Sequence, residues 1–539
     1  MKVTDTHREL LRRYPQAVVH LRQLLQARRL GVVLGAGVSL EAGLPSWSDL
    51  VSGIKGELVK LGVAPNDVEK ESEPVQTQIL FSRFRHFCLE DPDVEAVDAS
   101  YRDAEIASRW RQLVHDVLYA DVDNLKDLLD AHPYMEALSS VTQRLPLVVS
   151  YNFDDLLEKA LSGRASLQPE KSTVGYYSSW GANFVLQDGR PVVYHPNGYL
   201  PFNLVDRYSD SVVLTEEALS DQAIDYSLGG YATLLDHYAK QPCLFIGFSL
   251  ADASMRNLLR QAVRRAPGNV HYYIKYIEDD VPNNFDDIKE TNFDLFNMVT
   301  IPLNSSQIQA LLELVSIGEN EVFEDICHEE NCPTFYKYYI VGPVSVGKTS
   351  VVSHLRGVDV VDEWLTDREP LISKPSNKLS VEETELVDAW IMQQIRLKNM
   401  RFYRAQPGLH VMDRAPLDAF AFTPEGQHQD KALQIADNGR GMAEKLQSGC
   451  VIFLKGREYD LALRQKWRGR GGDAEYLRQQ QSNLDGVYGP VVSDGVYQID
   501  TSGQSLDLVV RKVLKQIHLS DYREFDFEAR LQKYTGVDV

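Results

Sequence analysis

The chain has 539 residues, of which 25% are charged and 44% hydrophobic, and its formal net charge is −21. This length exceeds a single hydrophobic core and predicts more than one domain. The acidic charge opposes general binding to nucleic acid or anionic lipid, and no apolar run approaches the roughly 20 residues that span a bilayer. The five cysteines are scattered and the first residues lack an apolar signal region, so we expect a cytoplasmic protein without a membrane partner.

The first motif is a glycine-rich turn that directly follows a short apolar run, residues 31–34. Such a run is typical of a buried parallel strand, and Gly35, Ala36 and Gly37 after it lack the side chains that would block a pyrophosphate. Their backbone amides could bind its oxygens. Ser39 is expected near the start of a helix, where the helix dipole favours an anion. The turn is not the dinucleotide fingerprint G-x-G-x-x-G, because position 40 is leucine.

Helical patterns surround this strand. Residues 7–29 have apolar side chains at helical spacing, interrupted near Pro15, and residues 51–144 continue as a long, charge-rich helical stretch. We predict that the second stretch is a helical layer inserted into the fold and covering the sheet.

Polar side chains follow two further predicted strands. The strand that ends at position 150 leads to Asn152 and Asp154, and the one that begins near position 191 ends in a turn with His195 and Asn197. Polar groups at a strand's carboxyl end often face a ligand crevice, although Asp154 could instead cap the next helix. An unperturbed histidine pKa of about 6.5 suits proton transfer, so His195 is a candidate acid or base. A histidine bonded within the turn is the alternative.

The sheet is completed by three more apolar runs. The run at residues 244–249 contains Gly247 and Ser249 and is followed by Asp252, which could serve only to cap a helix. Two strand-like runs, HYYIKY and MVTIPL, follow before about residue 317.

These motifs resemble the NAD-binding signature of the sirtuin family, which has G-A-G-[IV]-S, then G-[IL]-P, T-x-N-x-D, a His-Gly pair and a late G-x-S-x-x-D element. The resemblance implies that Asn152 serves catalysis and that Asp154 contacts the nicotinamide amide. Asn197 precedes the glycine here, whereas His195 matches the first histidine of the H-x-H-G of many sirtuin-like bacterial proteins, so either could handle the proton. The implied NAD contacts are Gly35, Ala36, Gly37, Ser39, Gly43, Pro45, Trp47, Gly247, Ser249 and Asp252.

Residues 318–334 are acidic and poor in large aliphatic side chains, which predicts a linker between two domains. Cys327, His328 and Cys332 lie close together in this stretch. They lack the paired C-x-x-C spacing of a structural zinc site, so we do not expect zinc here.

A second motif begins directly after this stretch. Residues 338–341 form a predicted strand, and Gly342 to Thr349 match the phosphate-binding loop G-x-x-x-x-G-K-[ST] at every position. In such a loop the backbone surrounds phosphate oxygens, Lys348 offsets their charge, and the Thr349 hydroxyl can ligate Mg²⁺. The helical pattern that follows supplies the required context. We predict a nucleotide site, and a degenerate loop without a ligand is the alternative.

The rest of this half resembles the deoxynucleoside and thymidylate kinases. In that family a carboxylate after the second strand acts as the base, which implies Asp362 or Glu363 here. A glutamine on the following helix reads the nucleobase, which implies Gln393 or Gln394.

Two more features carry the same resemblance. Asp413 and Arg414 match a [DE]-R-[ST] triplet that borders the acceptor, although Ala415 replaces the usual serine. An arginine-bearing segment resembles the lid that stabilises charge on the transferred phosphoryl group, and a solvated basic helix is the alternative. The implied nucleotide contacts are Gly342, Ser345, Gly347, Lys348, Thr349, Ser350, Glu363, Gln394, Asp413, Arg414, Arg464 and Arg468, with Lys466 and Arg470 also in the lid segment.

We therefore predict an α/β protein with two parallel sheets. A sirtuin-like, Rossmann-type sheet with a helical insertion occupies residues 1–317, and the acidic linker occupies residues 318–334. A P-loop kinase-like α/β domain follows at 335–518, with a C-terminal tail at 519–539.

The resemblance implies an NAD⁺ hydrolase of the bacterial anti-phage type, controlled by a kinase-like nucleotide sensor. Its ligands would be NAD and a nucleotide (ATP, a deoxynucleoside triphosphate or a monophosphate) with Mg²⁺, and we expect a homo-oligomer triggered by a nucleotide or a phage-derived molecule. One alternative is a nucleoside or nucleotide kinase, or a nucleotide-controlled binding module, with a non-cleaving NAD site. A protein deacylase is disfavoured, because the zinc ribbon of the deacylating sirtuins has two C-x-x-C pairs and this sequence has none.

Overall fold

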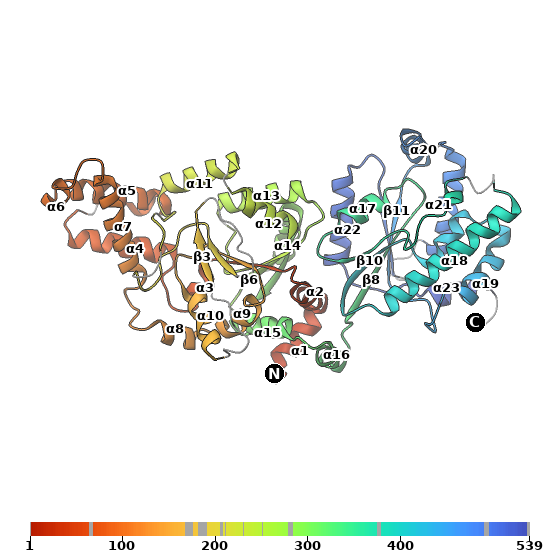
Figure 1. Ribbon diagram of the computed structural model, residues 1–539, viewed down its shortest axis with the longest axis horizontal. Coiled ribbons are helices and arrows are strands. Elements are labelled where there is room, and N and C mark those ends of the chain that lie inside the picture. The colour runs from red at the N-terminus through yellow and green to blue at the C-terminus, as the bar shows by residue number, and fades with distance from the viewer. Residues whose placement is uncertain are drawn as a thin grey trace. The chain divides into compact units, whose positions relative to one another are not determined.

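A computed structural model of the protein describes residues 2–63, 68–167, 176–181, 191–204, 208–210, 212–229, 231–250, 252–278, 284–374, 379–469, 471–489 and 495–535. The chain forms two compact units (Figure 1). The first comprises residues 1–7, 24–265 and 271–316, and the second comprises residues 8–23, 266–270 and 317–539. The chain therefore enters the second unit three times.

The first unit is built on a parallel sheet whose described strands have the order β3-β4-β2-β1-β5-β6-β7. Because β1 is central and the chain continues to β2 on one side and later to β5 on the other, the loops after these strands border a crevice. The strands are β1 (Gly31–Leu34), β2 (Leu147–Ser150), β3 (Tyr177–Trp180), β4 (Val192–His195), β5 (Cys243–Ile246), β6 (His271–Tyr276) and β7 (Met298–Leu303).

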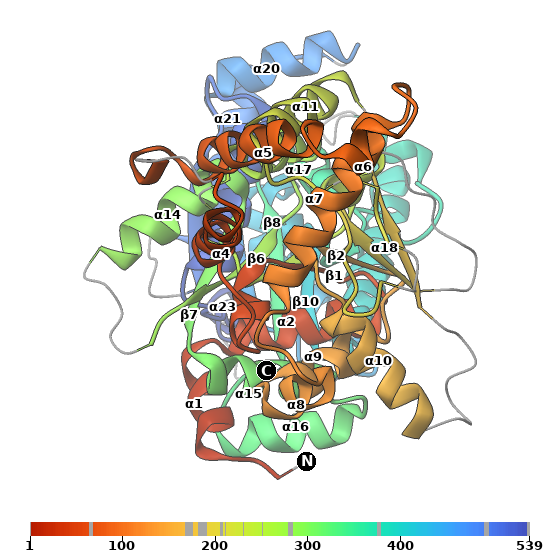
Figure 2. The ribbon, with the colours of Figure 1, turned by 90° about the vertical axis from the view of Figure 1, so that its left-hand side faces the viewer.

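Helices surround this sheet, and the predicted helical insertion lies between β1 and β2. Its helices α4 to α7 pack on one another, with the rings of Phe81 and Phe84 5.2 and 5.5 Å from that of Trp110 (Figure 2). The helices are α3 (Ala36–Leu40), α4 (Trp47–Lys60), α5 (Glu73–Leu89), α6 (Pro92–Glu95), α7 (Arg102–Leu118), α8 (Leu125–Ala131), α9 (Met135–Thr142), α10 (Leu156–Leu167), α11 (Glu216–Leu228), α12 (Ala232–Lys240), α13 (Ala253–Arg265), α14 (Phe285–Phe296) and α15 (Ser305–Ser316), with a 3₁₀ turn η1 (Val68–Lys70).

The second unit is also built on a parallel sheet, with the described strands in the order β12-β11-β8-β10-β9. The strands are β8 (Phe335–Val341), β9 (Asp359–Val361), β10 (Gly408–Asp413), β11 (Cys450–Lys455) and β12 (Val496–Asp500). The helices are α16 (Asn320–Glu329), α17 (Lys348–His354), α18 (Val381–Tyr403), α19 (His428–Asn438), α20 (Glu458–Trp467), α21 (Ala474–Tyr488), α22 (Leu506–Leu519) and α23 (Phe527–Thr535), with 3₁₀ turns η2 (Pro370–Ser373), η4 (Pro416–Phe422) and η5 (Glu425–Gln427). Two parallel α/β sheets confirm the predicted fold class.

The N-terminal helices α1 (Asp5–Arg13) and α2 (Pro15–Gln26) supply most of the first segment of the second unit. The Gln23 side chain lies against β10 like a short piece of strand: its Oε1 accepts from Leu409 N at 2.8 Å and its Nε2 donates to Leu409 O at 3.2 Å. Tyr338 of β8 donates to Gln16 Oε1 at 3.1 Å, and His20 Nε2 lies 3.0 Å from Gly357 O. Through these hydrogen bonds α2 packs against the sheet of the second unit.

Two stretches that the sequence predicted as a linker and a tail are folded parts of the second unit. The stretch at 318–334 contains α16, and Phe323 of this helix is buried. The Arg22 guanidinium lies over the Phe323 ring, 4.4 Å from the ring centre. The stretch after 519 contains α23, and its Phe527 lies in the core of the unit. Glu528 of the same helix forms an ion pair with Arg440 at 2.5 Å. Within the described parts of the chain, no helix is both long and apolar enough to cross a membrane.

Candidate functional sites

A pocket lies at the carboxyl ends of β1 and β2 in the first unit, with a volume of about 60 Å³. It brings together two segments that stand more than a hundred residues apart in the sequence, the turn after β1 and the turn after β2. The lining residues are Ala36, Ser39, Leu44, Pro45, Ser46, Trp47, Leu50, Leu118, Tyr151, Asn152, Phe153 and Asp154. Several of the predicted NAD contacts and two of the predicted catalytic residues therefore share one pocket.

The glycines of the first turn pack tightly against the turn after β5. A Cβ atom on Gly35 would lie 2.6 Å from Gly247 O, and one on Gly37 would lie 2.8 Å from Gly247 Cα. Their amides are also used, because Gly35 N donates to Ile246 O and Gly37 N to Gly247 O, each at 2.9 Å. Close packing thus explains the glycines, and Ala36 between them is the residue of this trio that lines the pocket.

A hydrogen-bonded chain of three polar side chains lines the pocket floor. Asn152 Nδ2 donates to Ser39 Oγ at 2.8 Å and to Gly35 O at 3.0 Å, and Ser39 Oγ donates to Asp154 Oδ2 at 2.5 Å. Asn152 Oδ1 and Trp47 Nε1 are buried and have no hydrogen-bond partner among the described residues. The pocket therefore presents one acceptor and one donor, and buried polar groups without partners are costly unless a ligand or water pairs with them.

Asp154 both caps a helix and faces the pocket. Its Oδ1 accepts from Leu156 N at 3.1 Å at the start of α10, and its Oδ2 accepts from Ser39. Burial raises the pKa of Asp154 to about 6. The side chain is therefore an anion at neutral pH, and its hydrogen bonds with Leu156 N and Ser39 Oγ fix its position.

His195 and Asn197 lie behind this pocket and are not among its lining residues. His195 is fully buried, with Nδ1 2.8 Å from Asn152 O and Nε2 2.7 Å from Glu158 Oε1. Burial alone would lower the pKa of His195, but the Glu158 carboxylate outweighs it and the pKa is raised. Asn197 Nδ2 donates to Tyr151 O at 3.3 Å. Sequence reasoning missed Glu158, which lies in the first turn of α10, just after Asp154.

The remaining predicted NAD contacts lie in the segments that follow β1 and β5 and are not among the lining residues of this pocket: Gly35, Gly37, Gly43, Gly247, Ser249 and Asp252. Asp252 Oδ1 accepts from Ser254 N at 2.7 Å and from Met255 N at 3.3 Å, so it caps α13. Gly43 and Gly247 have φ angles of 90° and 78°, which explains why glycine occupies both positions.

In the second unit, the P-loop runs from β8 into α17. Gly342, Ser345 and Gly347 have φ angles of 148°, 67° and 110°, which curve the backbone into a concavity for an anion. Lys348 Nζ donates to Gly342 O at 2.7 Å and to Pro343 O at 3.0 Å, and burial lowers its pKa to about 8. Ser345 Oγ is buried and has no partner among the described residues. Ser350, one turn into α17, faces the pocket beside this loop.

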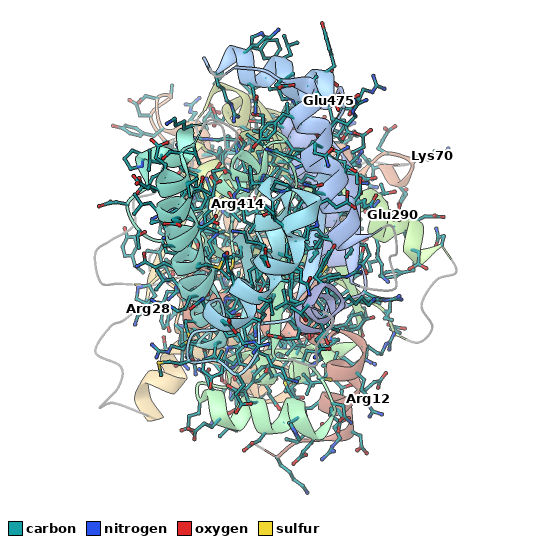
Figure 3. The ribbon with its side chains drawn as sticks, turned by 90° about the vertical axis from the view of Figure 1, so that its right-hand side faces the viewer. Arg12, Arg28, Lys70, Glu290, Arg414 and Glu475 are labelled. Carbon is teal, nitrogen blue, oxygen red and sulfur yellow. The ribbon has the colours of Figure 1, made fainter. Side chains whose placement is uncertain are left out.

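Beside the P-loop, a charged network joins three strand ends. Thr349 Oγ1 donates to Asp413 Oδ2 at 2.7 Å, and Arg414 Nε donates to Glu363 Oε1 at 2.7 Å. Asp362, by contrast, is exposed. The Arg414 side chain is 16% exposed and that of Glu475 is 72% exposed, and Figure 3 labels both residues.

The Thr349 hydroxyl and the Asp413 carboxylate fit a Mg²⁺ ion that phosphates help to hold. Asp413 Oδ1 is buried without a partner among the described residues, which leaves one carboxylate oxygen for a ligand. Mg²⁺ in nucleotide sites is bound by one or two such oxygens together with phosphates and waters. No group of three His, Cys, Asp or Glu side chains in the described ranges could hold a metal by itself, Cys327, His328 and Cys332 included.

Gln394 is used to hold a loop. Its Oε1 accepts from Leu365 N at 2.8 Å and its Nε2 donates to Thr366 Oγ1 at 2.6 Å, whereas Gln393 is exposed. Lys398, one turn further along α18, is the residue that sequence reasoning missed. Its Nζ donates to Asp413 O at 2.5 Å, and burial lowers its pKa to about 8.

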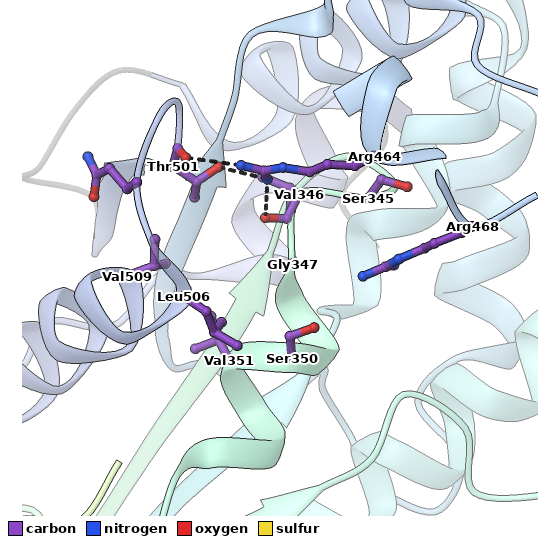
Figure 4. Close-up of a pocket in the computed structure, with 11 residues that line it drawn as sticks. Ser345, Val346, Gly347, Ser350, Val351, Arg464, Arg468, Thr501, Leu506 and Val509 are labelled. Carbon is purple, nitrogen blue, oxygen red and sulfur yellow. Dashed lines mark hydrogen bonds between the residues drawn. The ribbon is translucent and has the colours of Figure 1, made fainter. Parts of the chain in front are cut away.

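A larger pocket, of about 210 Å³, lies between the P-loop and the lid segment. Its lining residues are Ser345, Val346, Gly347, Ser350, Val351, Arg464, Arg468, Thr501, Gln504, Leu506 and Val509. Arg464 donates to Val346 O and Thr501 O, each at 3.2 Å, and Arg468 points toward the same pocket from the same side (Figure 4). Lys466 is exposed and Arg470 lies outside the described residues. Of the predicted lid arginines, Arg464 thus bonds to the phosphate-binding loop and Arg468 lines the pocket beside it.

Comparison with known proteins bears on both units. Residues 146–296 match the family model of the SIR2-like domain. No curated protein matches the chain. Among solved structures, the chain is similar to thymidylate kinase from Candida albicans (12% identity, 36% of this chain and 98% of that chain, TM-score 0.28) and to a gluconokinase from Sinorhizobium meliloti 1021 (17% identity, 34% of this chain and 91% of that chain, TM-score 0.22).

The class of protein follows from the fold, the sites and the family match together. The first unit contains a SIR2-like domain, as its sequence motifs predicted. The second unit has a P-loop at the end of the central strand of a parallel sheet. The chain therefore joins a SIR2-like domain to a P-loop unit built on a parallel sheet.

Proposed function

We propose that the first unit hydrolyses NAD⁺ and releases nicotinamide. The observation that carries this proposal is the pocket between the turns after β1 and β2, where Asn152 presents a buried oxygen without a partner beside Ser39 and Asp154. The SIR2-like family match supports NAD as the ligand. No acyl-lysine is needed for this reaction, which agrees with the absence of a C-x-x-C pair from the sequence.

The pocket side chains suit cleavage of the bond between nicotinamide and ribose. As that bond breaks, positive charge develops on the ribose, and the Asp154 carboxylate would stabilise this charge or orient the nicotinamide amide. Asn152 Oδ1 would accept a hydrogen bond from the attacking water or from a ribose hydroxyl, because its Nδ2 is already held by Ser39 and Gly35. Trp47 Nε1 is the donor available on the other wall.

We propose that the second unit binds a nucleotide with Mg²⁺ and controls the first. An enzyme that destroys NAD must be silent until needed, and phage replication perturbs deoxynucleotide pools, so this pairing would suit a defence enzyme that senses infection. For a nucleotide to act as a switch, it must bind the active and silent states with different affinities, and a coupling of about 1 to 3 kcal/mol changes affinity roughly 5- to 150-fold.

A second candidate function is phosphoryl transfer by the second unit. The observation that favours it is the complete network beside the P-loop, in which Glu363, Asp413 and Arg414 keep the positions expected of a base and of acceptor-binding groups. In that case the first unit would only hold NAD.

One assay separates these functions. Nicotinamide release from NAD⁺ is measured without any acylated peptide, in the wild type and in Asn152→Ala, while nucleoside mono-, di- and triphosphates are titrated. Release that depends on Asn152 and responds to a nucleotide supports both proposals. If nicotinamide is not released under any condition while a nucleoside or nucleotide is phosphorylated, the kinase function replaces the hydrolase.

A further inference from the structure

The turn that follows β4 holds three consecutive backbone carbonyls of the segment that carries Asn152. Asn197 Nδ2 donates to Tyr151 O at 3.3 Å, His195 Nδ1 lies 2.8 Å from Asn152 O, and Leu200 N donates to Phe153 O at 2.7 Å. Residues 195–200, here named the β4 turn, therefore hold the main chain of residues 151–153, and none of the six is among the lining residues of the pocket. Both residues that the sequence predicted as the acid or base belong to this set.

The proton positions on His195 follow from its partners. A carbonyl oxygen only accepts, so the 2.8 Å contact with Asn152 O requires a proton on Nδ1. The other nitrogen, Nε2, faces Glu158 Oε1 at 2.7 Å, and the same oxygen accepts from Ser178 Oγ of β3 at 3.1 Å. A carboxylate also only accepts, so Glu158 favours a second proton, on Nε2. His195 thus makes two donated bonds and has none left for a ligand.

Other charged groups near this pair belong to α10 and α7. Asp154 and Asp155 directly precede α10, which carries Glu158, and Lys159 Nζ lies 3.5 Å from Asp155 Oδ2. Tyr119 of α7 donates to Asp155 Oδ1 at 3.3 Å. The ring of Tyr199 covers His195 at a centroid distance of 4.7 Å. The Glu158 carboxylate is the one charged group in direct contact with the imidazole among the described residues.

We propose that His195 is a positioning residue for NAD cleavage and that Glu158, by holding the proton on Nε2, keeps His195 in the doubly protonated form that fixes the main chain of Asn152. The proposal rests on the proposed function of the first unit and assigns the proton-transfer role to neither His195 nor Asn197. Asn152 O is held by His195, and Asn152 Nδ2 donates to Ser39 Oγ and Gly35 O, which leaves Oδ1 as the side-chain polar atom of Asn152 without a partner among the described residues.

The pH dependence distinguishes this role from general-base catalysis, and the His195→Asn variant described below distinguishes it from general-acid catalysis. Above the raised pKa of His195 the imidazole loses one of its two protons. The proton on Nε2 stays because it is donated to the Glu158 carboxylate. Nδ1 therefore loses its proton, and the hydrogen bond to Asn152 O is lost. Nicotinamide release should therefore fall as the pH rises through this pKa. A general base at His195 would give the opposite sign, because only its neutral form accepts a proton.

Three substitutions test the proposal. In His195→Asn the side-chain amide can still donate to Asn152 O but cannot transfer a proton, so release should stay within about tenfold of the wild type, whereas loss of a general acid or base costs about 10²- to 10⁴-fold. His195→Leu, which removes the donor, should lose about 100-fold, as expected when a reacting group is displaced. In Glu158→Gln the amide donates to Nε2 and keeps the remaining proton on Nδ1, so the fall in rate at high pH should disappear.

The thermal unfolding midpoint of each variant shows whether it folds. Only the variants that fold are used to judge the proposal. Release in His195→Asn as low as in His195→Leu, with both folded, would overturn the proposal. So would a wild-type rate that rises through the pKa of His195, or a fall at high pH that persists in Glu158→Gln.

One measurement does not depend on NAD cleavage. In ¹⁵N-histidine-labelled wild type, the signals that disappear in His195→Asn report its two ring nitrogens, and both should be protonated at pH 7. An unprotonated Nδ1 contradicts the positioning role whether or not NAD is cleaved. A protonated Nδ1 in a protein that releases no nicotinamide would leave the geometry intact and count against the proposed function alone.

Discussion

The two units each place a glycine-rich turn at the carboxyl end of a central parallel strand, yet they use glycine for different purposes. In the first turn, Gly35 and Gly37 allow close packing against the turn after β5, and their amides bond to that neighbour. In the P-loop, Gly347 has open space where a Cβ would lie, and its positive φ angle of 110° curves the backbone around a space for phosphate. Glycine spacing alone therefore predicts a tight turn, but the neighbouring strand decides whether its amides remain available to a ligand.

The largest expected effect is a loss of catalysis in the pocket of the first unit, whereas the next prediction concerns ligand binding in the second unit. Asn152→Ala removes the free Oδ1 of the pocket, and loss of one such polar group from a reaction centre costs about 10²- to 10³-fold in rate. Nicotinamide release measured at saturating NAD checks this, with the thermal midpoint as a control for folding. A rate of nicotinamide release equal to that of the wild type would contradict a catalytic role for Asn152.

The next effect concerns the lysine that has no counterpart in the first turn. Lys348→Ala should weaken binding of a nucleoside triphosphate about 10- to 150-fold, because a charge-assisted bond contributes about 1.5 to 3 kcal/mol. NAD binding to the first unit should not change. Calorimetric titration with each ligand measures both. A nucleotide response of NAD cleavage that is identical in the wild type and in Lys348→Ala would contradict the sensor role.

A matched pair of glycine substitutions tests the comparison directly. In Gly37→Ala the new Cβ meets Gly247 Cα at 2.8 Å, so overpacking of backbone should lower the free energy of unfolding of the first unit by about 1 to 3 kcal/mol. In Gly347→Ala there is open space around the Cβ, and the cost is the strain of a φ of 110°, about 1 to 2 kcal/mol. Thermal unfolding of both variants measures these losses. Equal affinity for nucleotide in Gly347→Ala and the wild type would show that the loop curvature is not needed.

The smallest effect is a pH dependence confined to the second unit. Because the pKa of Lys348 is lowered to about 8, the lysine is charged below that pH and loses its charge above it. Phosphates bind the charged form, so nucleotide affinity should be full at pH 7 and about fourfold lower at pH 8.5. Lys398 has a similar pKa, so Lys348→Ala is the control, in which the dependence should shrink.

Much of the fold could be predicted from the sequence. The apolar runs that precede each motif form β1, β2, β4, β5 and β8, because buried parallel strands are continuous in hydrophobicity. The strand β3 (Tyr177–Trp180) was not predicted, since YSSW is only half-buried and lacks such a run. Residues 318–334 were predicted as a linker because α16 has few aliphatic side chains, and its burial depends on Arg22, far away in the chain.

The candidate sites were predictable in position but less so in detail. The order of motifs placed Asn152 and Asp154 beside the glycine turn, and the pocket brings them together. The direction in which His195 points could not be read from the sequence, because it depends on a carboxylate of α10. The same holds for Gln394, whose amide is taken by a loop that lies nearly thirty residues earlier. Partners supplied by distant elements decide whether a polar side chain faces a ligand or the protein.

The place of α2 in the second unit has a consequence for synthesis of the chain. The strands that Gln23 and Gln16 contact, β10 and β8, leave the ribosome more than three hundred residues after α2 does. At about 5 to 20 residues per second, the helix waits on the order of 15 to 60 s for its binding surface. During this time the apolar side chains Val18 and Leu21, buried in the finished protein, have no second unit to pack into. The second unit can therefore complete its fold only after α2 has waited for both strands.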